Sequence, residues 1–154
     1  MPSHEDVRQS PFSADEMFAV VADIEKYPEF VPGCAALKIM ERTSHGGIET
    51  IVAKMLVSVG ALRETYTSKV TLDKKNYAID ARHLDGPFHH LDTRWRILPR
   101  GAGSEVKFFI DFEFRNRVLA AASNLLFDGM TRKMTDAFIA RAKKLYVTSH
   151  SAQQ

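Results

Sequence analysis

Three polar residues are predicted to face the protein interior from strands, and they are the ones that could take part in chemistry. Ser68, His83 and Thr93 each fall on the apolar side of an alternating segment. General acid–base catalysis needs a titratable group within hydrogen-bonding reach of the substrate, and only His83 is such a group. The carboxylates that the pattern places fall on the hydrated faces: Asp80, Asp92, Asp111 and Glu113. A lone histidine at a strand end usually has a structural role, so the sequence does not favour an enzyme.

Metal and nucleotide sites are not indicated either. His89 and His90 are adjacent in a predicted strand, so their side chains point to opposite faces and match no zinc-ligand spacing. Cys34 is the one cysteine of the chain, and we interpret it as a small buried hydrophobic residue. The glycines of RGAGSE, residues 100–105, fit a hairpin turn, and no phosphate-binding glycine motif follows a strand. We therefore expect no metal ion and no cofactor.

The global composition is that of an ordinary globular domain. The chain has 154 residues, 45% hydrophobic and 26% charged, which is enough for one domain with a sizeable core. A net charge of +2 is too small to argue for nucleic-acid binding by itself. The first residues, MPSHEDVRQS, are unlike a targeting peptide, so we expect a cytoplasmic protein. We predict one domain over residues 1–148 and a flexible tail over residues 149–154.

Local signals mark the first elements. Residues 4–10 are predicted to form a short strand, and the helix after it begins with the capping-box spacing of Ser13 and Glu16. This helix should end before Pro28, because the residue before a proline disfavours helical geometry. A second short helical turn is predicted over residues 27–31.

The remaining pattern indicates a sheet followed by one helix. A strand is predicted over residues 37–41, and five later segments alternate apolar and polar residues at period two. From Arg117 to about Val147 the chain has no proline and has apolar residues at helical spacing, with a bend expected at Asp128-Gly129. The expected fold is α+β: a curved antiparallel sheet of six to seven strands around a long C-terminal helix, with two short helices after the first strand.

A sheet curved around a single helix leaves a space between them, and the pattern leaves open whether that space is filled or hollow. The segment DIEKYPEFVPGC, residues 23–34, puts Tyr27 and Phe30 at a helix end close to two prolines. Such rings either plug the end of a core or form the mouth of a cavity. Methionines beside aromatic residues are common core filler, and they also suit a pocket that adapts to a hydrophobic ligand.

Four segments resemble, in the same order, the coenzyme-Q-binding START-domain family: DIEKYPEFVPGC, LDGPFHHLDTRW, FFIDFEFRN and AFIARAKKLY. This family belongs to the polyketide-cyclase and lipid-transport superfamily, which has the helix-grip (START/Bet v 1-like) fold. The resemblance implies a cavity between sheet and helix that binds ubiquinone or a polyprenyl-quinone precursor. It also implies a carrier or chaperone that supports ubiquinone biosynthesis and respiratory electron transport without chemistry of its own.

The resemblance and the strand and helix patterns together predict the ligand-binding residues. Those near the mouth come from residues 27–32 and from a rim loop over residues 86–88, and the others come from the inner faces of the sheet and the last helix. The predicted set is Tyr27, Phe30, Met55, Val57, Phe88, Trp95, Phe112, Phe114, Phe127, Met130, Met134 and Phe138.

The expected partners are a polyprenyl quinone and, transiently, the inner membrane surface, which would place the protein in the cytoplasm at the membrane periphery. Two alternatives stay open. Some bacterial members of the family are ribosome-association toxins that bind the large ribosomal subunit, and an aromatase/cyclase-like enzyme would need Arg63 to converge with Ser68, His83 and Thr93. Contact with the ribosome would use basic residues along the last helix: Arg115, Arg117, Arg132, Lys133, Arg141, Lys143 and Lys144.

Overall fold

The computed structural model describes residues 3–59, 62–118, 120–121 and 129–147, so the tail predicted over residues 149–154 lies outside the described residues. In chain order the elements are β1 (Ser3–Ser10), α1 (Ala14–Ala22), η1 (Ile24–Lys26), α2 (Tyr27–Phe30), β2 (Cys34–His45), β3 (Ile48–Val59), β4 (Leu62–Asp73), β5 (Ala78–Asp85), β6 (Phe88–Arg100), β7 (Gly103–Phe114), α4 (Met130–Ala142) and η2 (Lys143–Val147). No helix among the described residues is long and apolar enough to cross a membrane.

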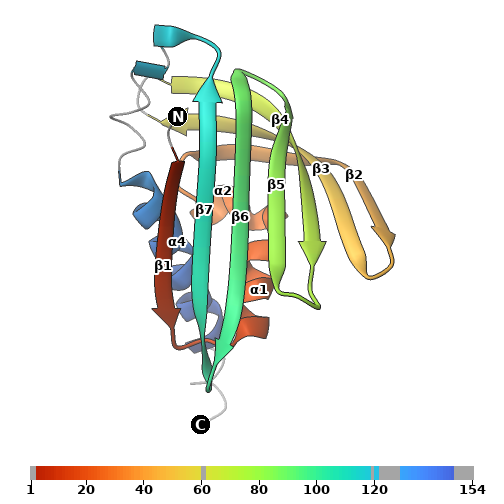
Figure 1. Ribbon diagram of the computed structural model, residues 1–154, viewed down its shortest axis with the longest axis vertical. Helices are drawn as coiled ribbons and strands as arrows, with labels where there is room; N and C mark the ends of the chain where they lie inside the picture. The colour runs from red at the N-terminus through yellow and green to blue at the C-terminus, as the bar shows by residue number, and fades with distance from the viewer. Residues whose placement is uncertain (1–2, 60–61, 119, 122–128, 148–154) are drawn as a thin grey trace.

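The seven strands form one antiparallel sheet in the order β1-β7-β6-β5-β4-β3-β2. Figure 1 shows α1, α2 and α4 on one face of this sheet, which bends around them towards β2 and β3. Shifts of the pairing register between β2 and β3, between β4 and β5 and between β6 and β7 supply local bends. The predicted α+β helix-grip fold is therefore confirmed.

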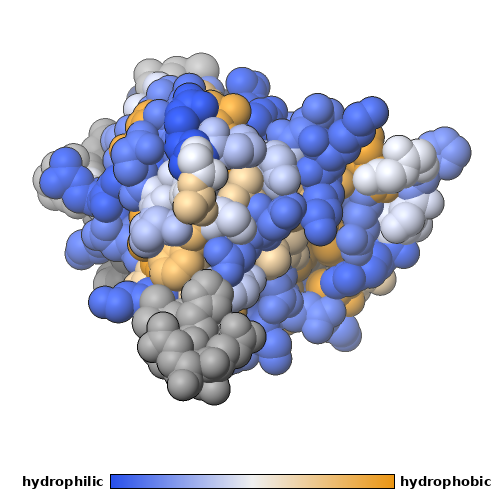
Figure 2. Space-filling model, turned by 90° about the horizontal axis from the view of Figure 1, so that it is seen from below, coloured by the Kyte–Doolittle hydropathy of each residue, from blue (hydrophilic) through white to orange (hydrophobic). Residues whose placement is uncertain are grey.

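The surface at the end of the molecule shown in Figure 2 is mainly hydrophilic. Seen from the end at which β6 and β7 turn, hydrophilic residues predominate and hydrophobic residues occupy small separate areas (Figure 2). The apolar sides of the strands face the helices instead, as the burial of Trp95, Phe108 and Phe112 shows. This is the one-sided burial that alternation at period two predicts.

The N-terminal helices follow their sequence signals. The Glu16 N–H donates to the Ser13 hydroxyl over 3.1 Å, and the Ser13 N–H donates to the Glu16 carboxylate over 3.0 Å, so the predicted capping box is present. Helix α1 ends at Ala22, and Pro28 lies in the first turn of α2, where its missing N–H costs no hydrogen bond. The second helical turn is thus confirmed.

The C-terminal helix is shorter than its apolar pattern predicts. Gly129 has φ of 80°, in the left-handed region, and forms the N-cap of α4. Residues 117, 118, 120 and 121 are helical but precede this glycine. The helix predicted from Arg117 to about Val147 therefore breaks at Gly129, where a bend is expected, because glycine adopts positive φ without the steric cost that other residues incur.

Helix α4 is fixed against the sheet edge by polar contacts with β1. The hydroxyl of Thr135, which is fully buried, hydrogen-bonds the carboxylate of Asp6. Beside this hydrogen bond, Arg8 on β1 and Asp136 on α4 form an ion pair with 2.7 Å between nitrogen and oxygen. These contacts set the position of α4 along β1, and they leave its apolar face directed at β6 and β7.

Candidate ligand-binding cavity

The hydrophobic interior is divided into two clusters. The larger joins α1, the strands and α4 and includes Val70, Trp95 and Phe138. The smaller consists of Phe88, Leu91, Phe112 and Phe114 at one end of the sheet. A cavity of about 150 Å³ lies between them. The space between sheet and helix is therefore hollow in part.

The cavity is lined from the α1–α2 region, the strands β2 to β7 and α4. Of the twelve residues predicted as ligand-binding, nine line it: Tyr27, Met55, Val57, Phe88, Trp95, Phe112, Phe114, Met134 and Phe138. Phe127 and the side chain of Met130 lie outside the described part of the chain. The lining reaches the strand ends at Val57, Glu64 and Phe114, so the cavity extends towards the end of the sheet where these strands meet their connections.

Phe30 differs from its prediction and does not line the cavity. Its ring packs edge-on against that of Phe138, with 5.1 Å between centroids, and the guanidinium carbon of Arg141 lies 5.2 Å from its centroid. Tyr27 contacts the same phenylalanine, at 5.3 Å, from the cavity side. The two rings of the YPEF segment therefore have separate roles: one lines the cavity, and the other supports Phe138 from behind.

Several lining residues were not among those predicted. They are contributed mainly by strand positions that face inwards, and they include Ile24, Val31, Cys34, Leu37, Tyr66, Ser68, Val70, Ile79, Ala81, Leu91, Thr93 and Ile110. The period-two pattern identifies most of them as inward-facing, so the signal was present. It does not distinguish inward positions beside a hollow from those inside a filled core.

Aromatic contacts hold the deep end of the cavity. Trp95 stacks on Phe108 with 4.4 Å between ring centroids and meets Phe138 at 4.7 Å. At the other end Phe88 and Phe114 are 4.6 Å apart. Contacts at these separations favour fixed relative orientations, so the hollow is bounded by positioned rings.

The four residues that an aromatase/cyclase-like enzyme would need do not all converge. His83 is absent from the lining, and its Nδ1 accepts a hydrogen bond of 3.1 Å from the N–H of Leu91, close to where the β5–β6 pairing ends. Arg63 is exposed and outside the lining. Ser68 and Thr93 line the cavity from β4 and β6, with β5 between them. Within the described ranges, no cluster of three or more His, Cys, Asp or Glu residues could hold a metal ion.

Two tyrosine hydroxyls are among the polar groups of the lining. The Tyr27 hydroxyl donates to the carbonyl of Val21, and the Tyr66 hydroxyl lies 3.4 Å from the sulfur of Met55. Burial raises the pKa of both tyrosines above the ordinary value, because an apolar surrounding disfavours the phenolate. Both therefore stay neutral throughout the physiological range.

Cys34 offers a direct chemical test of this environment. It lines the cavity, and burial raises the pKa of its thiol from 9.0 to about 11. Since the thiolate is the reactive form, we expect alkylation at pH 8 to be about 100-fold slower than for an ordinary thiol and to rise about tenfold per pH unit up to about pH 11. Rates of iodoacetamide labelling between pH 7 and 11 measure this. A plateau near pH 9 would contradict the burial of the thiol.

The fold and the cavity define the class: a START-like domain in which a curved sheet and a C-terminal helix enclose an apolar hollow. The family model described as polyketide cyclase / dehydrase and lipid transport matches residues 10–139, and the chain belongs to this family.

Individual proteins show the same likeness. The ribosome association toxin RatA of Rickettsia prowazekii is 32% identical over 148 residues, which cover 94% of this chain and 99% of that protein. The mitochondrial coenzyme Q-binding protein COQ10 homolog B of Xenopus laevis is 29% identical over 140 residues, covering 88% of this chain and 55% of that protein. The solution structure of CC1736 from Caulobacter crescentus superposes with a TM-score of 0.80 at 32% identity, covering 95% of this chain and 99% of the other.

Proposed function

We propose that the protein binds a polyprenyl quinone, ubiquinone or one of its precursors, without catalysing a reaction on it. The observation that carries the proposal is the apolar cavity between sheet and helix, lined by Trp95, Phe112 and Phe138 and by few polar groups. The likeness to a protein named as coenzyme Q-binding supports the same ligand. The protein then acts as a carrier or chaperone of the quinone in respiratory electron transport or quinone biosynthesis.

The size and direction of the cavity suit a ligand with a ring and a tail. Burial of apolar ligand surface contributes about 25 cal/mol per Å², so affinity does not need many polar partners. The hollow of about 150 Å³ is small for a whole polyprenyl chain, and the tail would leave past Val57 and Phe114. A carrier of such a ligand must exchange it with a bilayer. We therefore place the protein in the cytoplasm, at the membrane periphery.

The test is organic extraction and mass spectrometry of the protein purified from its native host. We expect ubiquinone or a precursor in near-stoichiometric amount. Incubation with quinone-loaded vesicles should also raise the unfolding temperature, since a ligand at 100 times its Kd stabilises by about 2.7 kcal/mol. If the extract contains no quinone and loading leaves the unfolding temperature unchanged, the proposed function is wrong.

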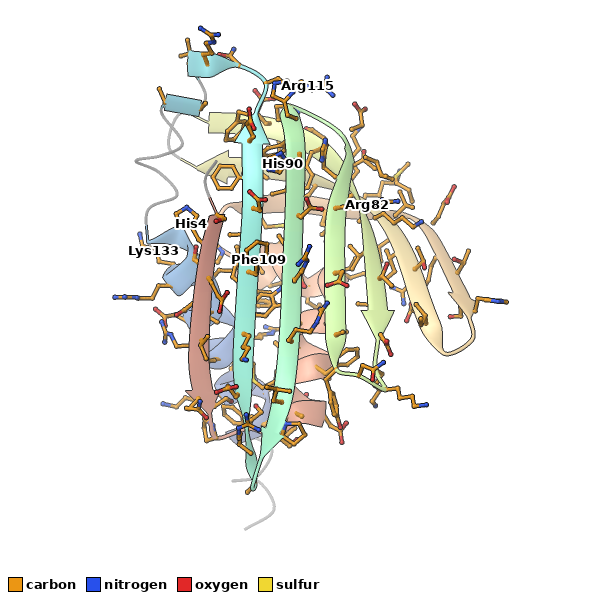
Figure 3. The ribbon with its side chains drawn as sticks, in the orientation of Figure 1. His4, Arg82, His90, Phe109, Arg115 and Lys133 are labelled. Carbon is orange, nitrogen blue, oxygen red and sulfur yellow. The ribbon has the colours of Figure 1, made fainter. Side chains whose placement is uncertain are left out.

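A second candidate function is association with the large ribosomal subunit, and one feature of the outer sheet face supports it. Lys38 on β2 lies directly opposite Lys54 on β3, and Lys69 on β4 lies directly opposite Arg82 on β5. None of the four forms an ion pair within the described part of the chain. Figure 3 shows Arg82 on the sheet, on the side away from the helices. Like charges directly opposite destabilise a sheet. Asp92 on β6 lies directly opposite Arg82 and offsets part of the repulsion, and rRNA phosphates would relieve the rest.

The helix surface predicted from the sequence is less suited to this role. Arg141 is largely buried, with 13% of its side chain exposed, and is engaged by Phe30 and Glu29. The Arg115 guanidinium donates to the carbonyl of Phe88 over 3.0 Å. Two of the seven predicted basic residues thus stabilise the fold itself, and the outer sheet face is the stronger candidate surface.

Charge reversal distinguishes the two surfaces. We expect the triple substitution Lys54→Glu, Lys69→Glu and Arg82→Glu to weaken salt-sensitive cosedimentation with large subunits at least tenfold. The matched control reverses the same number of charges on the exposed helix side: Arg132→Glu, Lys133→Glu and Lys144→Glu. Equal losses in both triples would reject the outer sheet face, and absence of cosedimentation by the unaltered protein would reject this candidate function.

A further inference from the structure

Tyr66 is a phenol on the cavity lining that has no strong hydrogen-bond acceptor. Its hydroxyl lies 3.4 Å from the sulfur of Met55, which is its one hydrogen-bond partner within the described residues. A thioether is a weak acceptor, whereas a buried tyrosine hydroxyl usually has a good one. Tyr27 shows the contrast, because its hydroxyl donates to the backbone carbonyl of Val21. Tyr66 therefore has an O–H that a better acceptor could take.

The position of Tyr66 is fixed by packing rather than by its hydroxyl. Its ring meets Phe88 edge-on, with 5.5 Å between centroids and 84° between planes. Gly86 lies against its backbone: a Cβ at this glycine would come within 2.5 Å of the Tyr66 Cβ, and its φ of 145° also favours glycine. The hydroxyl is thus held in place before any ligand binds, which lowers the entropic cost of using it.

The polar part of the lining is concentrated on the strand that carries Tyr66. Side chains two apart on a strand share a face, and Glu64, Tyr66 and Ser68 line the cavity in succession from β4. Ser68 is 8% exposed and lies directly opposite Ala53, so its hydroxyl also borders the hollow. The facing wall on β7 supplies Phe108, Ile110, Phe112 and Phe114 instead. The cavity therefore has one side with hydrogen-bonding groups and one that is apolar.

We propose that Tyr66 donates a hydrogen bond to a carbonyl oxygen of the bound ligand and so selects a carbonyl-bearing ring over a plain hydrocarbon of the same size. The carbonyl replaces the Met55 sulfur as acceptor, and the ring of the ligand then lies against β4 with its apolar edge towards β7. The inference rests on the proposed function and names the protein group that recognises the quinone.

The test compares two probes on the full chain: ubiquinone with two isoprene units, and an oxygen-free isoprenoid hydrocarbon of similar size. Each is titrated as a competitor of a fluorescent apolar dye. We expect Tyr66→Phe to weaken quinone binding about 3- to 10-fold, the effect of one net hydrogen bond, and to leave hydrocarbon binding unchanged.

Each other outcome has a defined meaning. Equal quinone affinity of Tyr66→Phe and the unaltered protein overturns the inference and leaves the proposed function intact. Equal weakening of both probes overturns it as well, because the residue would then act through packing alone. Failure of the unaltered protein to bind the quinone contradicts the proposed function, and the inference fails with it. Tyr77→Phe is the matched control: the Tyr77 hydroxyl donates to the Asp15 carboxylate over 2.9 Å, and Tyr77 does not line the cavity, so this substitution should leave the preference between probes unchanged.

Discussion

Replacing Phe138 with alanine is expected to lower the free energy of unfolding by about 3–5 kcal/mol. This phenylalanine is 1% exposed and is the point at which α4 meets the rest of the core. Its ring lies 4.7 Å from that of Trp95 on the sheet and 5.3 Å from that of Tyr27 at the start of α2. Truncation removes both contacts together with the burial of the ring itself. Urea unfolding, followed by the fluorescence of the single tryptophan, measures the change.

The control for this prediction is an aromatic residue of the same size on the other face of the sheet. Phe109 lies on β7 on the side away from the helices (Figure 3), with the guanidinium carbon of Arg94 5.4 Å from its centroid. Phe109→Ala loses a partly exposed surface contact, so we expect a cost below about 1.5 kcal/mol. Equal costs for the two substitutions would mean that α4 is not held through Phe138.

The inward and outward faces of the sheet could be predicted because each strand has one apolar and one polar side. Trp95 and Phe112 each lie between two charged neighbours, and a period of two admits a single assignment of faces. The capping box at Ser13 was equally accessible, since it depends on residues three apart. Patterns that are local in the sequence therefore determined most of the architecture.

The family resemblance implies the hollow, but the residue pattern could not predict it, because periodicity gives the direction of a side chain and not the distance between the sheet and the helix. Val70 and Phe112 face inwards in the same way whether the space beyond them is filled or open. Phe30 is aromatic like the lining residues, yet it packs against Phe138 outside the cavity. It lies one helical turn after Tyr27, which does line the cavity. The bend at Gly129 is expected from the sequence, but the end of the helix there depends on a backbone angle that a glycine permits and does not require.

The basic surface illustrates a second limit of prediction from the sequence. Basic residues that are neighbours along the last helix are easily recognised in the sequence. In the structure, however, Arg141 contacts the ring of Phe30 and pairs with Glu29. The charges of the outer sheet face come from four strands and become neighbours only through the pairing register, as in the pair of Lys69 and Arg82. Such a surface has no signature in the linear order of residues.

Filling the cavity gives the second large effect. Ala81 lines the hollow from the middle of β5, directly between Val70 on β4 and Thr93 on β6. Ala81→Phe puts a ring into the space that the ligand would occupy, so we expect quinone binding to weaken at least tenfold. Stability should change by less than about 2 kcal/mol, because the new ring gains apolar burial that offsets the cost of overpacking. Titration with ubiquinone of two isoprene units measures binding, and urea unfolding measures stability.

The neighbouring residue supplies the control and connects the two candidate functions. Arg82→Phe adds a ring of the same kind one position along β5, on the outer face, and should leave quinone binding unchanged. Unaltered binding by Ala81→Phe would show that the quinone is held elsewhere than between sheet and helix. Ribosome cosedimentation should respond in the opposite way, falling with Arg82→Phe and persisting with Ala81→Phe, because the two sites lie on opposite faces of one strand. A cavity variant that lost both activities while still folded would instead mean that ligand occupancy controls the outer surface.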